Sequence, residues 1–198
     1  MGFVSKYIAL EGGDGSGKST VSAALRTRLA ELGHPVIVVR EPGGTALGEA
    51  VRGLLLDSDR IDDWAEVFLF AAQRAELVRQ VVTPALDTGK WVISDRTYYS
   101  SIAYQGRARG LGVDLVRSIN ETGLGGVFPD HVIVLDVDPE KALARQDDPD
   151  RIGSEDVEFQ TAVRDGYLDL GRTDPLVSVL DGSLPIDDLV DEIMEIVT

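Results

Sequence analysis

The amino-acid sequence predicts an α/β fold in which one parallel sheet of five strands carries helices on both of its faces. Short runs of β-branched and aromatic residues alternate with segments of helical period, which is typical of βαβ units. The run from Val36 to Val39 is continuously apolar, as expected of a strand that helices cover on both sides. A glycine-rich loop also joins the first expected strand to the first expected helix. These three observations favour a sheet of the kind that binds ligands at the carboxyl ends of its strands.

The first half of the chain follows this alternation element by element. Residues 7–11 form an apolar strand that ends at the glycine-rich loop. From Ser19, apolar residues recur every three or four positions, which predicts a helix that Gly33 ends. The same patterns then predict a strand at 35–40, helices at 46–56 and 62–86, the second with Pro84 near its end, and a strand at 91–95.

The second half continues the pattern with more breaks. Helical segments at 98–105 and 113–121 are separated by residues 106–112, whose glycines and arginines predict a mobile polar turn. Pro139 favours the first turn of a helix, which residues 146–150 interrupt. The remaining elements are strands at 131–136 and 176–181 and helices at 139–145, 156–170 and 186–197. Because no repeat or linker interrupts the chain, we expect a single domain over residues 1–198.

Composition places the chain among globular proteins. Of its 198 residues, 43% are hydrophobic and 27% are charged. No apolar run approaches the roughly 18 residues that cross a bilayer, and residues 1–6 lack the apolar segment of a secretory signal, so a cytoplasmic protein without a membrane partner is expected. There is no cysteine, and two histidines alone do not complete a tetrahedral metal site. Any metal is therefore expected on oxygen ligands.

The charge balance is strongly acidic. Lysine and arginine total 19 against 34 aspartates and glutamates, giving a net charge of −15. This charge argues against nucleic acid or an anionic membrane as partner. An anionic substrate would need a local cluster of cations instead. With only four lysines in the chain, one lysine inside a glycine loop stands out.

Residues 12–19 fit the phosphate-loop pattern, with Gly12, Gly17, Lys18 and Ser19 at its fixed positions. The loop lies between a strand and a helix, where backbone N–H groups converge on an anion, and this placement argues against an ordinary glycine turn. Lys18 is expected to pair with the β- and γ-phosphates, and the Ser19 hydroxyl to ligate magnesium. The motif predicts a P-loop NTPase fold. The expected ATP-binding residues are Gly12, Gly13, Asp14, Gly15, Ser16, Gly17, Lys18, Ser19 and Thr20.

Three arginines favour a monophosphate as the phosphoryl acceptor. Arg52, Arg74 and Arg96 lie where the fold would gather them at the carboxyl edge of the sheet. A monophosphate already presents an anionic oxygen, so it needs charge neutralisation more than a catalytic base. Guanidinium groups bind phosphate through two hydrogen bonds. The alternative for Arg52 alone is a surface ion pair.

From the first strand to the last, the chain resembles the thymidylate kinase family. Seven motifs in order carry the resemblance: residues 12–19, 40–45, 54–56 and 70–74, Asp95-Arg96 with Tyr104-Gln105, Pro129-Asp130, and residues 150–152. The resemblance implies transfer of the γ-phosphoryl group of ATP to dTMP, giving dTDP in dTTP biosynthesis, with Mg²⁺ as cofactor. It also implies a homodimer through the helices around 65–82. The nearest alternative is a kinase for dUMP or a CMP-type acceptor; a non-catalytic nucleotide switch is less favoured.

The resemblance assigns residues to the acceptor. Arg96 and Arg52 would hold its phosphate, and Arg74 would lie over the thymine ring or bond to its carbonyl. By the same resemblance Phe70 would stack on the other side of the ring. Phe70 and Arg74 lie four residues apart on one predicted helix, so both can reach one ligand, although a core aromatic is the alternative for Phe70. Some relatives have a cis peptide bond at the position of Pro42.

Further residues are assigned in the same way. Asp14 would contact the deoxyribose 3′-hydroxyl and help to place magnesium; its alternative is a turn residue. Tyr104 would crowd the 2′ position. The remaining assignments are Ser101 and Gln105 to the thymine edge, where a helix surface is the alternative, and Glu41 and Asp95 to the orientation of arginines and magnesium-bound water.

Residues 146–154 are expected to close as a lid that excludes water from the phosphates. Family members carry a catalytic arginine either in the P-loop or in the lid. Because Gly15 occupies the P-loop position, the lid is expected to supply it, as in the bacterial type, and Arg151 is preferred over Arg145. The lid is short and acidic, with Gly153 where a glutamate is frequent, and Arg151 could instead pair with neighbouring aspartates. The expected catalytic residues are Asp14, Lys18, Arg96 and Arg151.

Overall fold

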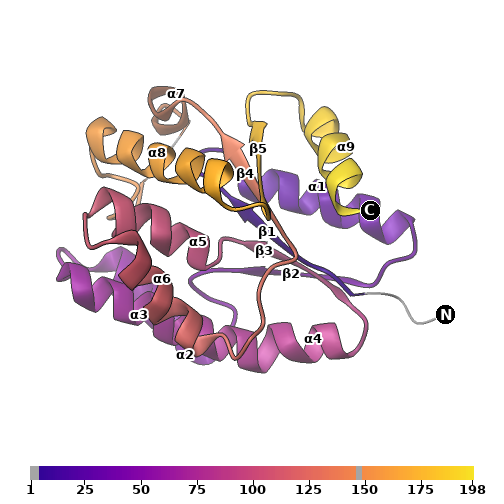
Figure 1. Ribbon diagram of the computed structural model, residues 1–198, viewed down its shortest axis with the longest axis horizontal. Coiled ribbons are helices and arrows are strands. Elements are labelled where there is room, and N and C mark those ends of the chain that lie inside the picture. Colours follow the sequence, from indigo (N-terminus) through magenta and orange to yellow (C-terminus); the bar gives the residue numbers. More distant parts are fainter. Residues whose placement is uncertain (1–4, 146–148) are drawn as a thin grey trace.

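The computed structural model describes residues 5–145 and 149–198. Within these ranges, five strands form one parallel sheet in the order β2-β3-β1-β4-β5 (Figure 1). The strands are β1 (Tyr7–Glu11), β2 (Val36–Arg40), β3 (Trp91–Asp95), β4 (His131–Asp136) and β5 (Val177–Asp181). The predicted five-stranded parallel sheet is confirmed, and every strand boundary lies within one residue of its predicted position.

Helices connect the strands and cover both faces of the sheet (Figure 1). They are α1 (Lys18–Glu31), α2 (Ala46–Asp57), α3 (Asp63–Leu77), α4 (Thr83–Asp87), α5 (Tyr98–Ser101), α6 (Val113–Gly123), α7 (Pro139–Leu143), α8 (Val157–Thr173) and α9 (Ile186–Val197), with π-helical segments η1 (Val78–Val82) and η2 (Ile102–Ala108). None of the helices in the described ranges is long and apolar enough to span a membrane.

The hydrophobic core has two layers because successive strand residues point to opposite faces of the sheet. Ile8 and Leu10 of β1 pack in a cluster with residues of α1 and α9. Ala9, between them, belongs to the opposite cluster, which includes residues of η2 and α8. Burial on both faces explains the continuous apolar runs of the central strands β1, β3 and β4. The expectation that helices cover both sides of residues 36–39 is wrong, because β2 is an edge strand and its Val38 is 41% exposed.

Two predicted helices differ from the observed ones through π-helical turns. The helix expected at 62–86 runs as α3, η1 and α4, and Asp62 caps it by accepting a hydrogen bond from Trp64 N at 3.0 Å. The helix expected at 98–105 continues through η2 to Ala108, so the predicted polar turn at 106–112 is wrong for its first three residues. Period counting does not detect an extra residue in a turn, because the helix continues past it.

The strand register brings polar residues to the carboxyl edge of the sheet. Asp95 at the end of β3 lies beside Leu10 of β1 and Arg40 of β2. The loop after β1 and the Glu41–Pro42 peptide bond, which is cis, lie at this same edge. The edge where three strands end therefore carries the residues that the sequence assigned to phosphate chemistry.

Candidate active site

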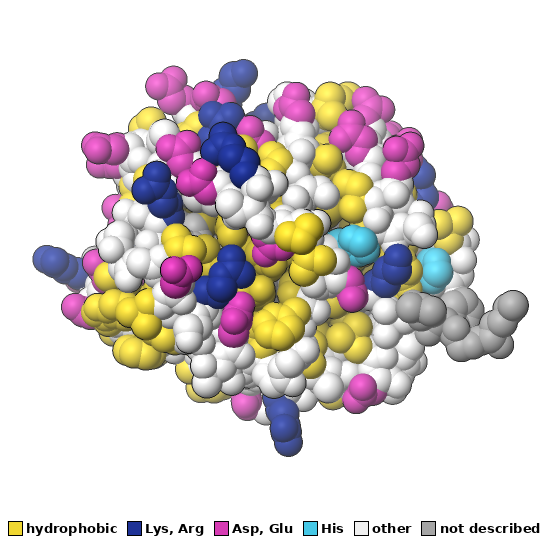
Figure 2. Space-filling model, viewed as in Figure 1, with side chains coloured by type: hydrophobic (Ala, Val, Ile, Leu, Met, Phe, Trp, Pro, Cys, Tyr) yellow, Lys and Arg dark blue, Asp and Glu magenta, His cyan; other side chains and the backbone are white. Residues whose placement is uncertain are grey.

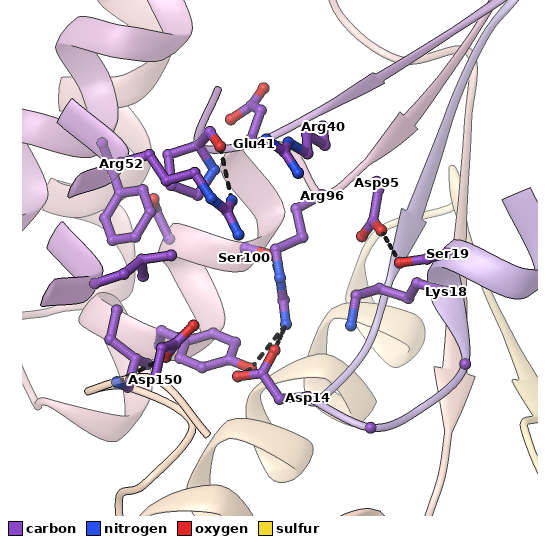
Figure 3. Close-up of a pocket in the computed structure, with 18 of the residues that line it drawn as sticks. Asp14, Lys18, Ser19, Arg40, Glu41, Arg52, Asp95, Arg96, Ser100 and Asp150 are labelled. Carbon is purple, nitrogen blue, oxygen red and sulfur yellow. Dashed lines mark hydrogen bonds and ion pairs between the residues drawn. The ribbon is translucent and has the colours of Figure 1, made fainter. Parts of the chain in front are cut away.

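A cavity of about 450 Å³ opens at the carboxyl edge of the sheet (Figure 3). It receives residues from the glycine loop, the end of β2, α2, α3, the end of β3, η2 and the segment after α7. The predicted site residues that line it are Asp14, Gly15, Gly17, Lys18, Ser19, Thr20, Glu41, Arg52, Phe70, Asp95, Arg96, Ser101, Tyr104 and Gln105. Gly12, Gly13 and Ser16, which belong to the same glycine loop, line a second, smaller hollow. Two predicted residues, Arg74 and Arg151, do not line either cavity.

The glycine loop forms the donor side of the cavity. Gly17 has a φ of 93° and precedes the first turn of α1. Lys18 is 7% exposed, and its Nζ donates to the carbonyl oxygens of Gly13 at 2.8 Å and Gly12 at 3.1 Å. Burial and the nearby Arg96 lower the pKa of Lys18 to about 8. The loop thus presents a helix N-terminus and a confined ammonium group, which together suit a phosphate chain.

The surroundings of Gly15 leave no room for an arginine at this position of the loop. Its φ is 77°, and a Cβ atom placed on it would lie 2.2 Å from the carbonyl oxygen of Ala142 in α7. Any larger residue would therefore displace either the loop or α7. Arg145, just after α7, lines the cavity, and its Nη1 donates to the Gly15 carbonyl at 3.3 Å. A cation from the segment after α7 thus reaches the position where a side chain does not fit.

Arg151 is held away from the cavity. Its Nη2 bonds to Glu66 Oε2 at 2.6 Å, and its Nε donates to the Leu55 carbonyl at 2.9 Å. In this structure Arg145 therefore lies closer to the phosphate loop than Arg151 does, and the expected catalytic role of Arg151 stays a prediction. The physical reason is a buried carboxylate, Glu66, that lies 85 residues earlier in the chain and gives no local signal beside Arg151. Residues 146–148 of the predicted lid lie outside the described residues.

Arg96 projects into the cavity from the end of β3. Its φ of 75° is in the left-handed region, which a residue without glycine's freedom rarely adopts. Its guanidinium bonds to Asp14 and, at 3.0 Å, to Ser100 Oγ (Figure 3). Burial alone would lower the pKa of Arg96, but Tyr104 and Asp14 raise it well above its usual value. The same pairing lowers the pKa of Asp14 although burial opposes this, so both groups stay ionised.

Glu11 supports this arrangement and was missed in the sequence. The carboxylate is fully buried and accepts hydrogen bonds from Thr97 N and Ser100 Oγ at 2.7 and 2.6 Å, and from Tyr167 OH at 2.8 Å. Ser100 and Tyr167 also contact the Arg96 guanidinium. Glu11 thereby holds the turn that gives Arg96 its unusual φ. The available signal was a carboxylate at the end of an otherwise apolar strand.

The other predicted arginines differ in position. Arg52 lines the cavity and donates to the Pro42 carbonyl at 2.9 Å. Arg74 is 2% exposed and lies behind the wall, paired with Glu41 and bonded to Ser101 Oγ at 3.2 Å. Because these two partners line the cavity, the structure makes Arg74 a support for the wall, and its expected contact with a ligand base stays a prediction. Arg40, which the sequence analysis did not assign, also lines the cavity.

Aromatic and amide groups form the wall opposite the glycine loop. Phe70, Tyr104 and Gln105 all line the cavity, and Tyr104 OH bonds to an Arg96 nitrogen at 3.2 Å. The Arg96 guanidinium also lies over the Tyr104 ring, 5.2 Å from its centre. Ser101 lines the cavity as well. This wall combines aromatic side chains with a few polar groups, which is the lining typical of small-molecule sites.

Ser19 and Asp95 offer oxygen ligands at the donor side. Ser19 Oγ donates to Asp95 Oδ2 at 2.7 Å (Figure 3). The described ranges contain no group of three acidic, histidine or cysteine side chains that could hold a metal alone. Magnesium is usually bound by one or two protein oxygens together with phosphate and water, and rarely by protein ligands alone. The two oxygens of Ser19 and Asp95 therefore fit Mg²⁺.

The fold, the phosphate loop and the arginines around one cavity define a P-loop phosphotransferase of the nucleoside monophosphate kinase type. Comparison with known proteins agrees. A profile of the thymidylate kinase family matches residues 10–193, and the chain belongs to this family. It is 45% identical to the thymidylate kinase of Deinococcus radiodurans, over 94% of this chain and 93% of that protein. It is 40% identical to that of Finegoldia magna, over 96% of each chain, and 44% identical to that of Symbiobacterium thermophilum, over 98% and 93%.

Proposed function

We propose that this enzyme transfers the γ-phosphoryl group of ATP to dTMP, giving dTDP, a step in dTTP biosynthesis. One observation carries the proposal: the phosphate loop and the arginines Arg52, Arg96 and Arg145 line the same cavity, together with aromatic and amide side chains that could hold a base. Thymidylate kinases at 40–45% identity support the choice of acceptor.

The donor phosphates would lie against the N-terminus of α1 and Lys18. Lys18 Nζ now bonds to loop carbonyls, and a phosphate group could replace them as its partner. Arg145 would add a second cation from the opposite direction, through the segment that contacts Gly15. Charge that spreads over the transferred group is thereby stabilised on two sides.

The acceptor phosphate would be held by Arg96 and Arg52, both of which line the cavity. Its oxygen is already anionic, so the reaction needs alignment and charge neutralisation and no obligatory protein base. We also propose the predicted role of Asp14 at the deoxyribose hydroxyl, because its carboxylate already lies between Arg96 and Tyr104 OH. Tyr104 would then lie beside the sugar and disfavour a 2′-hydroxyl.

We propose Mg²⁺ as the cofactor, held by Ser19 and, directly or through water, by Asp95. When bound, the ion would neutralise charge on the donor phosphates. The hydrogen bond from Ser19 to Asp95 already holds these two oxygen ligands next to each other in the cavity.

An acceptor comparison tests the proposed activity. Purified enzyme, ATP and Mg²⁺ are combined with dTMP, dUMP or CMP, and formation of the diphosphate is followed. We expect the highest kcat/KM with dTMP, and a margin of roughly 10-fold or more over dUMP, because one buried methyl group supplies about this much discrimination. If dUMP or CMP gave the highest kcat/KM instead, that nucleotide would be the preferred acceptor. ATP binding without any diphosphate product would instead favour a nucleotide switch.

We further propose a cytoplasmic homodimer of single-domain chains, each closed by a lid around 146–154. Large apolar side chains are exposed on neighbouring helices: Leu47 and Leu54 of α2 are 45% and 55% exposed, and Phe68 of α3 is 57% exposed. Figure 2 shows hydrophobic side chains gathered at the lower left, where α2 and α3 lie. Sedimentation of the parent and of Phe68→Glu tests the dimer, which the substitution should weaken.

A further inference from the structure

A buried carboxylate on α3 joins the wall of the cavity to the segment that carries Arg151. Glu66 is 1% exposed. Its Oε1 accepts from Gln105 Nε2 at 2.8 Å and from Arg109 Nε at 3.2 Å, and its Oε2 accepts from Arg151 Nη2 at 2.6 Å. Only Gln105 of these three partners lines the cavity. Glu66 therefore lies one layer behind the acceptor site.

The two arginines keep Glu66 ionised. Burial alone would raise the pKa of Glu66, but hydrogen bonds from Arg151 and Arg109 outweigh burial and lower it below its usual value. An ionised carboxylate accepts hydrogen bonds and donates none. Whatever faces it must therefore be a donor.

This constraint determines which end of the Gln105 amide meets the cavity. The NH₂ group must face Glu66, so the carbonyl oxygen Oε1 must point the other way. Among the described residues, no group donates a hydrogen bond to Oε1. This oxygen is also absent from the buried polar atoms that lack a partner, so solvent can reach it. Since Gln105 lines the cavity, Oε1 is open to it as a hydrogen-bond acceptor.

We propose that Glu66 is a positioning residue that sets pyrimidine selectivity by fixing the Gln105 amide with its oxygen toward the acceptor base. The inference rests on the proposed function, in which this cavity holds a pyrimidine monophosphate. Thymine and uracil carry a hydrogen on ring nitrogen N3 and can donate it to Oε1. Cytosine has an unprotonated N3, which would meet the oxygen as a second acceptor. Buried polar groups that lose their partner discriminate strongly.

The test compares kcat/KM for dTMP with kcat/KM for dCMP. In Glu66→Gln, the neutral amide at position 66 can donate or accept, so Gln105 can turn and present NH₂ to cytosine. We expect the dTMP-to-dCMP ratio to fall about 10-fold or more. A Glu66→Gln protein that folds, binds ATP and keeps its ratio within about twofold of the parent would overturn the proposal. A purely structural role for Glu66 would lower both rates together.

Glu155→Gln is the matched control. Glu155 is another carboxylate on the Arg109 guanidinium, 2.8 Å from Nη1, and among the described residues it makes no hydrogen bond to Gln105. The same chemical change there should leave the selectivity ratio unaltered. An equal fall in this variant would attribute the effect to the charge on Arg109, and Glu66 would lose its proposed role.

A second measurement needs no variant of Glu66. Hydrogen exchange of the Gln105 side-chain amide, followed by NMR, should be slow, and the amide protons should keep their bond to Glu66 when dTMP binds. Gln80 is the reference, because it also donates to a glutamate, Glu76, but is exposed. Exchange as fast as that of Gln80 would overturn the proposal. If the parent phosphorylates no pyrimidine monophosphate, the proposed function fails, whereas this measurement still tests the contact.

Discussion

The donor side and the acceptor side of the cavity are built in different ways. Eight consecutive residues, 12–19, supply the donor side with a backbone loop, one lysine and one hydroxyl. The acceptor side collects side chains from several elements, and partners distant in the sequence hold them: Asp14 and Tyr167 hold Arg96, and Glu66 holds Gln105. A local motif therefore specifies the donor side, while the acceptor side depends on long-range pairs. Substitutions should separate the two.

Lys18→Met breaks the donor side and should have the largest effect. It removes the cation on the phosphate loop, so transfer should fall by roughly 10³-fold or more while the fold persists. The measurement is steady-state dTDP formation, with circular dichroism as the control for folding. Turnover at the parental rate would remove the loop lysine from the mechanism.

Arg145→Ala and Arg151→Ala compare the two ends of the lid segment. Arg145 lines the cavity, so its loss should lower kcat about 100-fold with little change in stability. Arg151 pairs with the buried Glu66, so its loss should destabilise the fold by about 1–3 kcal/mol and lower kcat less. Urea unfolding and steady-state kinetics on both variants check this. The reverse pattern would identify Arg151 as the catalytic cation, as the sequence predicts.

Arg96→Ala should sharpen the contrast between substrates. Loss of a charge-assisted phosphate contact should raise KM for dTMP about 30-fold and leave KM for ATP within about threefold. Arg28→Ala is the control, since Arg28 pairs with Asp191 on the surface. A larger effect on ATP than on dTMP would move Arg96 to the donor side.

The pH dependence of ATP binding should be the smallest effect. With a pKa of about 8, Lys18 is charged at pH 7 and about nine-tenths neutral at pH 9. ATP favours the charged form, so affinity should fall about tenfold between these pH values, with proton uptake on binding at the higher pH. Calorimetry measures both. Lys18→Arg, which stays charged, should lose this dependence.

Most of the fold could be predicted because each element is a local pattern. The strands, the phosphate loop and most helix limits follow from apolar period and glycine positions. The π-helical turns could not be predicted, because they do not interrupt the apolar stripe. Residue types also could not reveal that Arg74 lies behind the wall or that Arg151 binds Glu66, since these depend on tertiary contacts.

One missed residue did leave a signal. The family resemblance assigned Phe70 and Arg74, which lie four residues apart on one helix, and the same spacing continues one turn back to Glu66. A carboxylate on the helix face that points toward the ligand is expected to be buried, and a buried carboxylate needs a cationic partner. Glu11, at the end of an apolar strand, could have been recognised as a buried carboxylate in the same way.

The pairing of Asp14 with Arg96 has a consequence for turnover. Without substrate, the arginine already holds an anion that belongs to the protein itself. In the proposed function, an incoming phosphate would compete with Asp14 for the guanidinium, and binding would exchange one anion for another. This competition would lower the net gain in free energy on binding and would give Arg96 a partner when product departs. The enzyme would thus give up some affinity for both substrate and product, and rapid release would be favoured over tight retention.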